Sequence, residues 1–241
     1  MKLILSWDDG HPSDKRLAEL LLKYKLKATF FVPAKNSEGM PVMSKNDLRT
    51  IDRDFEIGSH TLNHVYLKGL PRLKQQEEIN GGKNFLEDIL GHEIPGFCYP
   101  GGKFDEITLS CLKVANVKYA RTIKNFVFSK QNNYLEIATS FQFYPHKKRV
   151  LIGNLIKKDL TFERIKFASE LLRYFGSNAN WNMISDHLKD KQTTLHVWGH
   201  SWELDKLNLW PELEIFLKNL VQLKPTVKTL GEYYLENSRG F

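Results

Sequence analysis

The sequence predicts an α/β protein with a mostly parallel sheet, either open or closed into a barrel. Short apolar β-rich runs alternate along the chain with longer amphipathic stretches, which is typical of repeated βα units. The 241 residues are 41% hydrophobic and 12% aromatic, enough for a sizeable core. No linker or internal repeat is visible, so we expect one domain over residues 1–241.

The elements follow from the spacing of apolar residues. Strands are expected at residues 2–7, 28–32, 55–59, 96–99, 118–122, 135–139 and 193–198. Helices are expected at residues 14–24, 44–51, 72–90, 105–114, 162–175, 211–223 and 229–235. Leu17, Leu20 and Leu21 share one face of the first helix, and Ser44 with Asp47 has the spacing of a capping box. Residues 125–160 are the least regular part and predict irregular strands and loops.

The charge and the cysteines narrow the class of protein. A net charge of +7 and a pI of about 9.2 describe a basic chain whose basic runs are short. We expect no nucleic-acid partner, although the charge could attract an anionic substrate or a membrane surface. Cys98 and Cys111 lack the spacing of a disulfide framework or a metal site, and buried or half-buried thiols are expected.

The first ten residues carry an apolar stretch that is too short for a signal peptide or a membrane span. With this as the native start, we expect a cytoplasmic protein without stable membrane insertion.

Two carboxylates follow the first expected strand, as Asp8 and Asp9 before Gly10. Successive strand residues point to opposite sides, so both carboxylates can face one side only if the strand ends or twists there. Gly10 permits such a break. The alternative interpretation is a simple turn, for which Asp-Gly is favoured.

Two imidazoles follow the third expected strand, at His60 and His64. At a spacing of four residues on a helical turn, they lie on one face and can bind one metal ion. An ordinary surface turn is the alternative. Because the carboxyl ends of strands in such folds gather the chemistry, we expect the carboxylates and imidazoles at one edge of the sheet.

Together with Tyr99-Pro100-Gly101-Gly102 at a later strand end, these motifs resemble the polysaccharide deacetylase family, also called the NodB-homology or carbohydrate esterase family 4 domain. Its Thr-Phe-Asp-Asp-Gly motif reads Ser-Trp-Asp-Asp-Gly here, and its His-[Ser/Thr]-x-x-His motif is intact. The resemblance covers nearly the whole chain and is strongest in residues 1–125. It implies an irregular (β/α)7-type barrel, NodB-like in topology.

The resemblance also implies roles for the first two motifs. Asp8 would be the general base, and Asp9, His60 and His64 would bind a divalent metal ion. Three protein ligands leave positions open, as a hydrolytic site requires. Zinc is the expected ion, and cobalt, nickel or iron also suit mixed nitrogen and oxygen ligands.

The third family motif, Arg-x-Pro-x-Gly, lacks its arginine here. In the family this arginine orients the base, and Arg121 near the end of the next strand is a candidate replacement. A structural salt bridge is the alternative role for Arg121. Gly101 would offer its N–H to the developing oxyanion, with Pro100 and Tyr99 in the same substrate-binding loop.

The last motif would supply a general acid. His200 resembles the histidine of a His-Pro-Trp-Glu version of this motif, whereas His196, in mid-strand, is more easily interpreted as a packed residue. Trp198 and Trp202 could wall the pocket or stack on a sugar ring, or belong to the core.

The resemblance therefore implies a metal-dependent hydrolase that removes N-acetyl groups from an amino sugar in a polysaccharide or its precursor. The expected partner is a carbohydrate carrying N-acetyl groups. One alternative is a deformylase or other amidohydrolase acting on a lipid-linked or small-molecule substrate. Another, suggested by the missing arginine, is a catalytically degenerate carbohydrate-binding domain.

Overall fold

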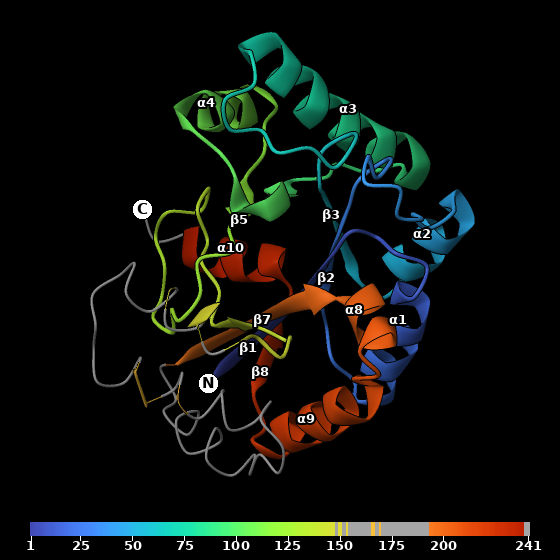
Figure 1. Cartoon of the computed structure of the whole chain (residues 1–241), viewed down its shortest axis with the longest axis vertical. Helices are drawn as coiled ribbons and strands as arrows, with labels where there is room; N and C mark the ends of the chain where they lie inside the picture. The colour runs from blue at the N-terminus through green and yellow to red at the C-terminus, as the bar shows by residue number, and fades with distance from the viewer. Residues whose placement is uncertain (148, 151–152, 154–164, 167–168, 170–192, 239–241) are drawn as a thin grey trace.

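A computed structural model describes residues 1–147, 149–150, 153, 165–166, 169 and 193–238 (Figure 1). The helix predicted at 162–175 lies outside the described residues, apart from three of its positions.

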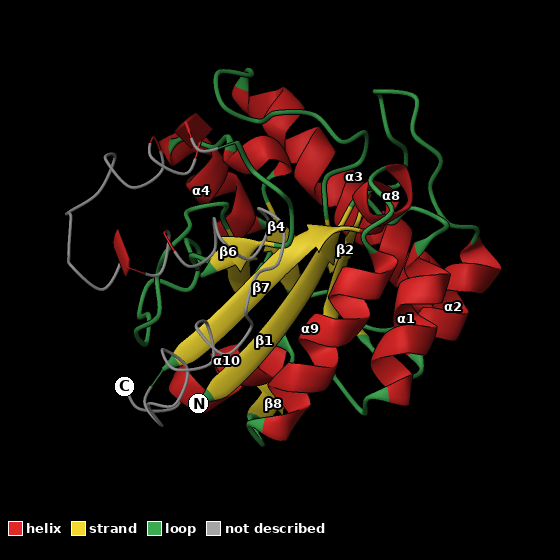
Figure 2. Cartoon of the chain, turned by 60° about the horizontal axis from the view of Figure 1, so that its bottom comes forward, coloured by secondary structure: helices red, strands yellow, loops and turns green. Residues whose placement is uncertain are grey.

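Within these described residues, eight parallel strands form one curled sheet. They are β1 (Lys2–Asp8), β2 (Thr29–Val32), β3 (Glu56–Ser59), β4 (Gly96–Cys98), β5 (Tyr119–Arg121), β6 (Phe141–Gln142), β7 (Thr194–His200) and β8 (Thr226–Lys228). Their order is β5-β4-β3-β2-β1-β7-β6, and β8 pairs with the first half of β1. The long strands β1 and β7 run side by side through the centre (Figure 2).

The segment before β6 joins the two edges of the sheet. Ala120 of β5 donates its N–H to Tyr134 and accepts from Ile137, and Ser140 donates its N–H to His196 of β7. The prediction of a strand at residues 135–139 was wrong in its position. Ile137 makes only an isolated bridge to Arg121, because the segment crosses from one strand to the other, and the paired residues are 141–142.

Helices cover the outside of the sheet (Figure 2). They are α1 (Asp14–Lys23), α2 (Lys45–Asp52), α3 (Arg72–Leu90), α4 (Glu106–Val114), α8 (Ser201–Lys206), α9 (Trp210–Gln222) and α10 (Leu230–Ser238). The capping box predicted for α2 is confirmed, with Ser44 and Asp47 each accepting from the other's backbone N–H. The sequence did not predict the short elements α8 and β8, nor the 3-10 turn Pro100–Gly102.

The period of two along the strands separates an outer face from an inner one. On β1, Leu3, Leu5 and Trp7 pack in the cluster beneath the helices. Ile4 belongs instead to a separate cluster with Phe31, Cys98 and other residues of the barrel interior. Asp8 therefore ends β1 on the inner face.

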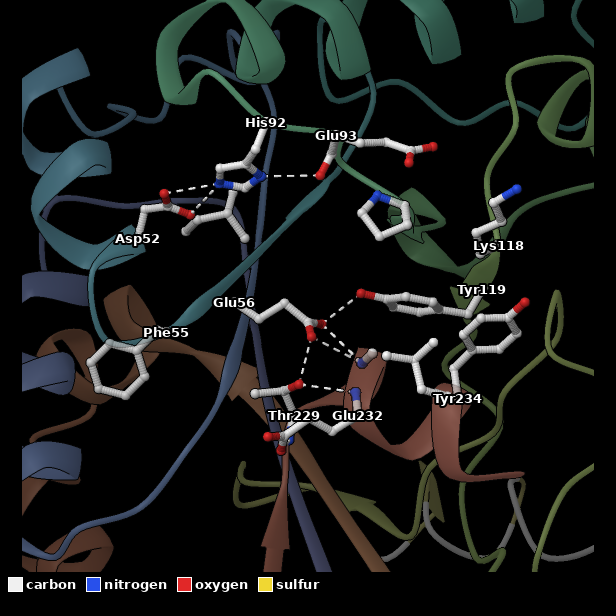
Figure 3. Close-up of a pocket in the computed structure, with 14 residues that line it drawn as sticks. Asp52, Phe55, Glu56, His92, Glu93, Lys118, Tyr119, Thr229, Glu232 and Tyr234 are labelled. Atoms are coloured by element: carbon white, nitrogen blue, oxygen red, sulfur yellow. Dashed lines mark hydrogen bonds and ion pairs between the residues drawn. The ribbon is translucent and has the colours of Figure 1, made fainter. Parts of the chain in front are cut away.

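The amino ends of the strands are closed by α10. Glu56, half-buried at the start of β3, accepts hydrogen bonds from the hydroxyls of Thr29, Tyr119 and Thr229 and from the N–H of Gly231. Figure 3 shows the bonds from Tyr119 and Thr229. A cavity of about 670 Å³ lies beside it. Because its carboxylate oxygens are already occupied by these donors, Glu56 has the contacts of a structural residue at the end of the barrel opposite Asp8.

Candidate active site

A left-handed turn brings the two adjacent carboxylates into one interior. β1 ends at Asp8, and the next two residues have φ values of +75° at Asp9 and +58° at Gly10. A Cβ on Gly10 would lie 2.5 Å from a Val32 methyl carbon, so only glycine fits. Successive strand residues point to opposite faces, but the turn allows both carboxylates to face inward. Asp8 does so from the end of the strand, and Asp9 from the turn after it.

Asp9, His60 and His64 converge on one point. Asp9 Oδ1 lies 3.1 Å from His64 Nε2 and 3.7 Å from His60 Nε2. One ligand atom from each residue lies within 4.8 Å of the others, and all three residues are buried. The Nδ1–H of His60 donates to the Cys98 carbonyl at 2.8 Å, which directs Nε2 toward Asp9. This donor set fits the three protein ligands of an open divalent-metal site.

His64 is held less completely than His60. Its Nδ1 is buried without a hydrogen-bond partner among the described residues, and the closest carboxylate oxygen is that of Glu38, at 4.0 Å. The loop of Glu38 is tied to the histidine loop, because Lys35 and Ser37 donate their N–H groups to Leu62 and Asn63.

Arg121 contacts Asp8, as the sequence hypothesis of a replacement arginine requires. Arg121 Nη2 donates to Asp8 Oδ1, and both side chains are almost fully buried. The guanidinium carbon lies 4.7 Å from the centre of the Trp198 ring, whose N–H is fixed by Asn125. Burial on its own would raise the pKa of Asp8, but Arg121, His60 and His200 outweigh it and lower that pKa. Asp8 is therefore ionised at neutral pH.

His200 and His196 have different environments. His200 Nε2 lies 3.8 Å from Asp9 Oδ2, and its Nδ1–H donates to Glu203 at 2.8 Å. Burial would lower the pKa of His200, but the hydrogen bond to Glu203 and the charge of Asp9 raise it to about 9. His196 bonds Ser6 inside the barrel, and burial together with Arg121 lowers its pKa to about 3. Of these two histidines, His200 is the one that combines proximity to Asp9 with a proton to give at neutral pH.

The remaining predicted residues are the two tryptophans and the loop of Tyr99, Pro100 and Gly101. Trp202 donates its N–H to Asp9 Oδ2 at 2.9 Å, and Trp198 lies under Arg121, so both lie at the site. Gly101, with a φ of +57°, is exposed in the turn that begins at buried Pro100. Tyr99, predicted in the same substrate-binding loop, turns its side chain away from the site. Because alternate residues of β4 face outward, its ring packs in a third cluster, which we call the outer cluster, and its hydroxyl donates to the Leu135 carbonyl. The buried members of the outer cluster are Leu67, Ile79, Phe97, Tyr99, Cys111, Leu112, Val117 and Ala120.

Three residues with contacts at the site were missed by the sequence reasoning. Glu203 stands three residues after His200, a helical spacing that could have indicated the pair. Cys98 lies 3.7 Å from Asp8 through its sulfur, and the alternation along β4 could have predicted that it faces inward. Glu38 lies in an exposed loop without a sequence signal.

The fold and the site together define an α/β protein with paired carboxylates and a three-ligand donor set at the carboxyl ends of its strands. Residues 2–120 match the family model described as polysaccharide deacetylase. This match, over about half of the chain, confirms the resemblance predicted from the motifs.

Two curated relatives illustrate the range of similar proteins. A peptidoglycan-N-acetylglucosamine deacetylase of Bacillus cereus is 30% identical over 115 residues, which are 47% of this chain and 52% of that protein. A probable 4-deoxy-4-formamido-L-arabinose-phosphoundecaprenol deformylase of Wigglesworthia glossinidia brevipalpis is 26% identical over 157 residues, 59% of this chain and 50% of that protein. Each match spans about half of the relative's length.

The fold is shared with a solved structure. A family 4 acetyl xylan esterase of Clostridium thermocellum, determined with a cobalt ion, superposes with a TM-score of 0.61. The match covers 99% of this chain and 92% of the esterase at 16% identity. The predicted fold class is confirmed. Among the described residues, no helix has the length and apolar character needed to cross a membrane.

Proposed function

We propose that this protein is a metal-dependent hydrolase that removes N-acetyl groups from an amino sugar of a polysaccharide or its precursor. The observation that carries the proposal is the separation of the two carboxylates. Asp9 lies with His60 and His64, whereas Asp8 lies with Arg121. A binding domain has no use for a second ionised carboxylate held in this way, but a hydrolase needs one as a base.

The residues divide the work of amide hydrolysis. Asp9, His60 and His64 would hold a divalent ion, which when bound supplies Lewis-acid polarisation and a more acidic water. Asp8 Oδ2 accepts a proton from the attacking water, while Arg121 holds Oδ1 and keeps the carboxylate ionised. The Gly101 N–H stands in an exposed turn, where it could donate to the developing oxyanion.

His200 completes the reaction as the general acid. An amine leaves poorly unless it is protonated, so the collapse of the tetrahedral intermediate needs a proton at the nitrogen. His200 Nε2 faces the donor set, and Glu203 holds Nδ1 and favours the charged form. Trp202, half-buried and bonded to Asp9, offers an aromatic surface beside the site for a sugar ring.

A second substrate class keeps the same machinery. The similarity to a sugar deformylase over 59% of this chain supports formamide hydrolysis on a lipid-linked amino sugar. The net charge of +7 also suits a phosphate-bearing substrate.

One experiment tests the function and separates these candidates. The purified protein is loaded with zinc or cobalt and incubated with N-acetylglucosamine oligomers and with formylated and acetylated sugar phosphates. We expect acetate release, and formate release instead would favour the deformylase. Stoichiometric metal without release from any substrate would contradict the proposal and favour a binding domain.

A further inference from the structure

A thiol lies directly behind the proposed catalytic base. Cys98 ends β4 on its inner face, and its sulfur is 3.7 Å from Asp8 Oδ2, the oxygen that Arg121 does not bind. Cys98 is fully buried, as are Asp8 and His60 to within a few per cent. One ligand atom from each of these three residues lies within 4.8 Å of the others. We call Asp8, His60 and Cys98 the thiol donor set, and Asp9, His60 and His64 the catalytic donor set.

Both donor sets include His60. His60 Nδ1 donates to the Cys98 carbonyl, so Nε2 is the nitrogen that remains for a metal ion. A nitrogen lone pair binds one ion at a time. The two sets therefore exclude each other, and an ion in the thiol donor set also occupies the carboxylate that the reaction needs as its base.

The chemistry of the two sets selects different ions. The catalytic set offers one oxygen and two nitrogens, whereas the thiol set offers oxygen, nitrogen and sulfur, and soft thiolates favour soft ions. Binding displaces the thiol proton to solvent and leaves a thiolate. The three anions Asp8, Asp9 and the thiolate then balance a divalent ion together with Arg121, so the buried cluster becomes neutral.

We propose that Asp8, His60 and Cys98 form a second, inhibitory site for a thiophilic divalent ion such as Cd²⁺, mutually exclusive with the catalytic donor set. Binding to this site is independent of the proposed hydrolase function, and only its inhibitory effect rests on that function.

The test uses the metal-free protein titrated with Cd²⁺. A sulfur–cadmium bond gives a charge-transfer absorption in the ultraviolet that oxygen and nitrogen ligands do not give. We expect this absorption in the unaltered protein, its loss in Cys98→Ser, and its retention in Cys111→Ser. Cys111 is a matched control because it is also a buried thiol but packs in the outer cluster with α4. Absorption that persists in Cys98→Ser, or is absent from the unaltered protein, overturns the proposal.

Elemental analysis after saturation with Cd²⁺ tests the exclusion. We expect one tightly bound ion per chain and loss of the charge-transfer band on addition of excess Co²⁺. Two ions held together would overturn the shared-nitrogen argument. On a substrate that the zinc form turns over, Cd²⁺ should inhibit Cys111→Ser at least ten-fold more strongly than Cys98→Ser. If no substrate is turned over, the absorption still decides whether the site exists, so failure of the function and failure of the site remain distinguishable.

Discussion

At the scale of single residues, the site depends on two charged contacts that orient its base and its acid. Arg121 holds Asp8, and Glu203 holds His200. The sequence indicated Arg121 only as one of two interpretations, because a strand-end arginine forms structural salt bridges as readily as catalytic ones. Glu203 was not predicted, because its motif was interpreted only for the role of His200. The fold places both residues at the site, because it brings the carboxyl ends of β1, β5 and β7 together.

Replacing Arg121 by Gln should disable the base without removing the metal ion. Without the guanidinium, burial raises the pKa of Asp8 and its orientation is lost, so we expect kcat to fall by about 100-fold at neutral pH. Metal content should not change. The exposed Arg49→Gln variant serves as the control. Unchanged kcat in Arg121→Gln would show that Arg121 is a structural residue only.

Replacing Glu203 by Gln should move the basic limb of the pH profile. The pKa of His200 is about 9 and is raised by Glu203, so activity should fall as the pH rises through about 9. The variant loses this raising effect, the pKa of His200 falls, and the limb shifts to lower pH. The kcat–pH profile of both proteins measures the shift. A limb that stays in place would remove His200 as the acid.

At the scale of elements, the strands and their ends were the predictable part of the molecule. Apolar runs bounded by glycine, aspartate and proline gave seven expected strands, of which six match observed ones to within two residues at each end. The strand at 135–139 was misplaced, because its pairing changes partners between β5 and β7 and no local pattern encodes that crossing. β8 was missed because its three residues are too short to show a period.

The contact between Glu56 and α10 predicts a change in stability without a change in chemistry. Glu56→Ala removes the acceptor from the buried donors of Tyr119 and Gly231 and from the half-buried hydroxyl of Thr229, and we expect a loss of about 3 kcal/mol in the free energy of unfolding. Urea titration measures it.

Glu93→Ala is a matched control at the rim of the same cavity and should change stability by less than about 0.5 kcal/mol. In both variants kcat should be unaltered below the melting temperature. A reduced kcat in Glu56→Ala at full folding would mean that the two ends of the barrel are coupled.

At the scale of the whole molecule, the carboxyl ends of the strands gather residues that are up to 193 positions apart in the chain, as Asp9 and Trp202 are. Ion binding at that edge should therefore stabilise the entire fold. With free zinc at 100 times its dissociation constant, we expect about 2.7 kcal/mol of added stability, seen as a higher Tm that chelation reverses. His60→Ala should show no such gain, and a gain equal to that of the unaltered protein would place the ion elsewhere.

The division of labour between the two carboxylates is the claim on which the rest depends. Its most direct measurement is the metal content and the acetate release of Asp8→Asn beside those of the unaltered protein. We predict a full complement of metal with turnover reduced at least 100-fold, since the ligands Asp9, His60 and His64 remain while the base is gone. Full turnover in Asp8→Asn, or loss of its metal, would contradict this division.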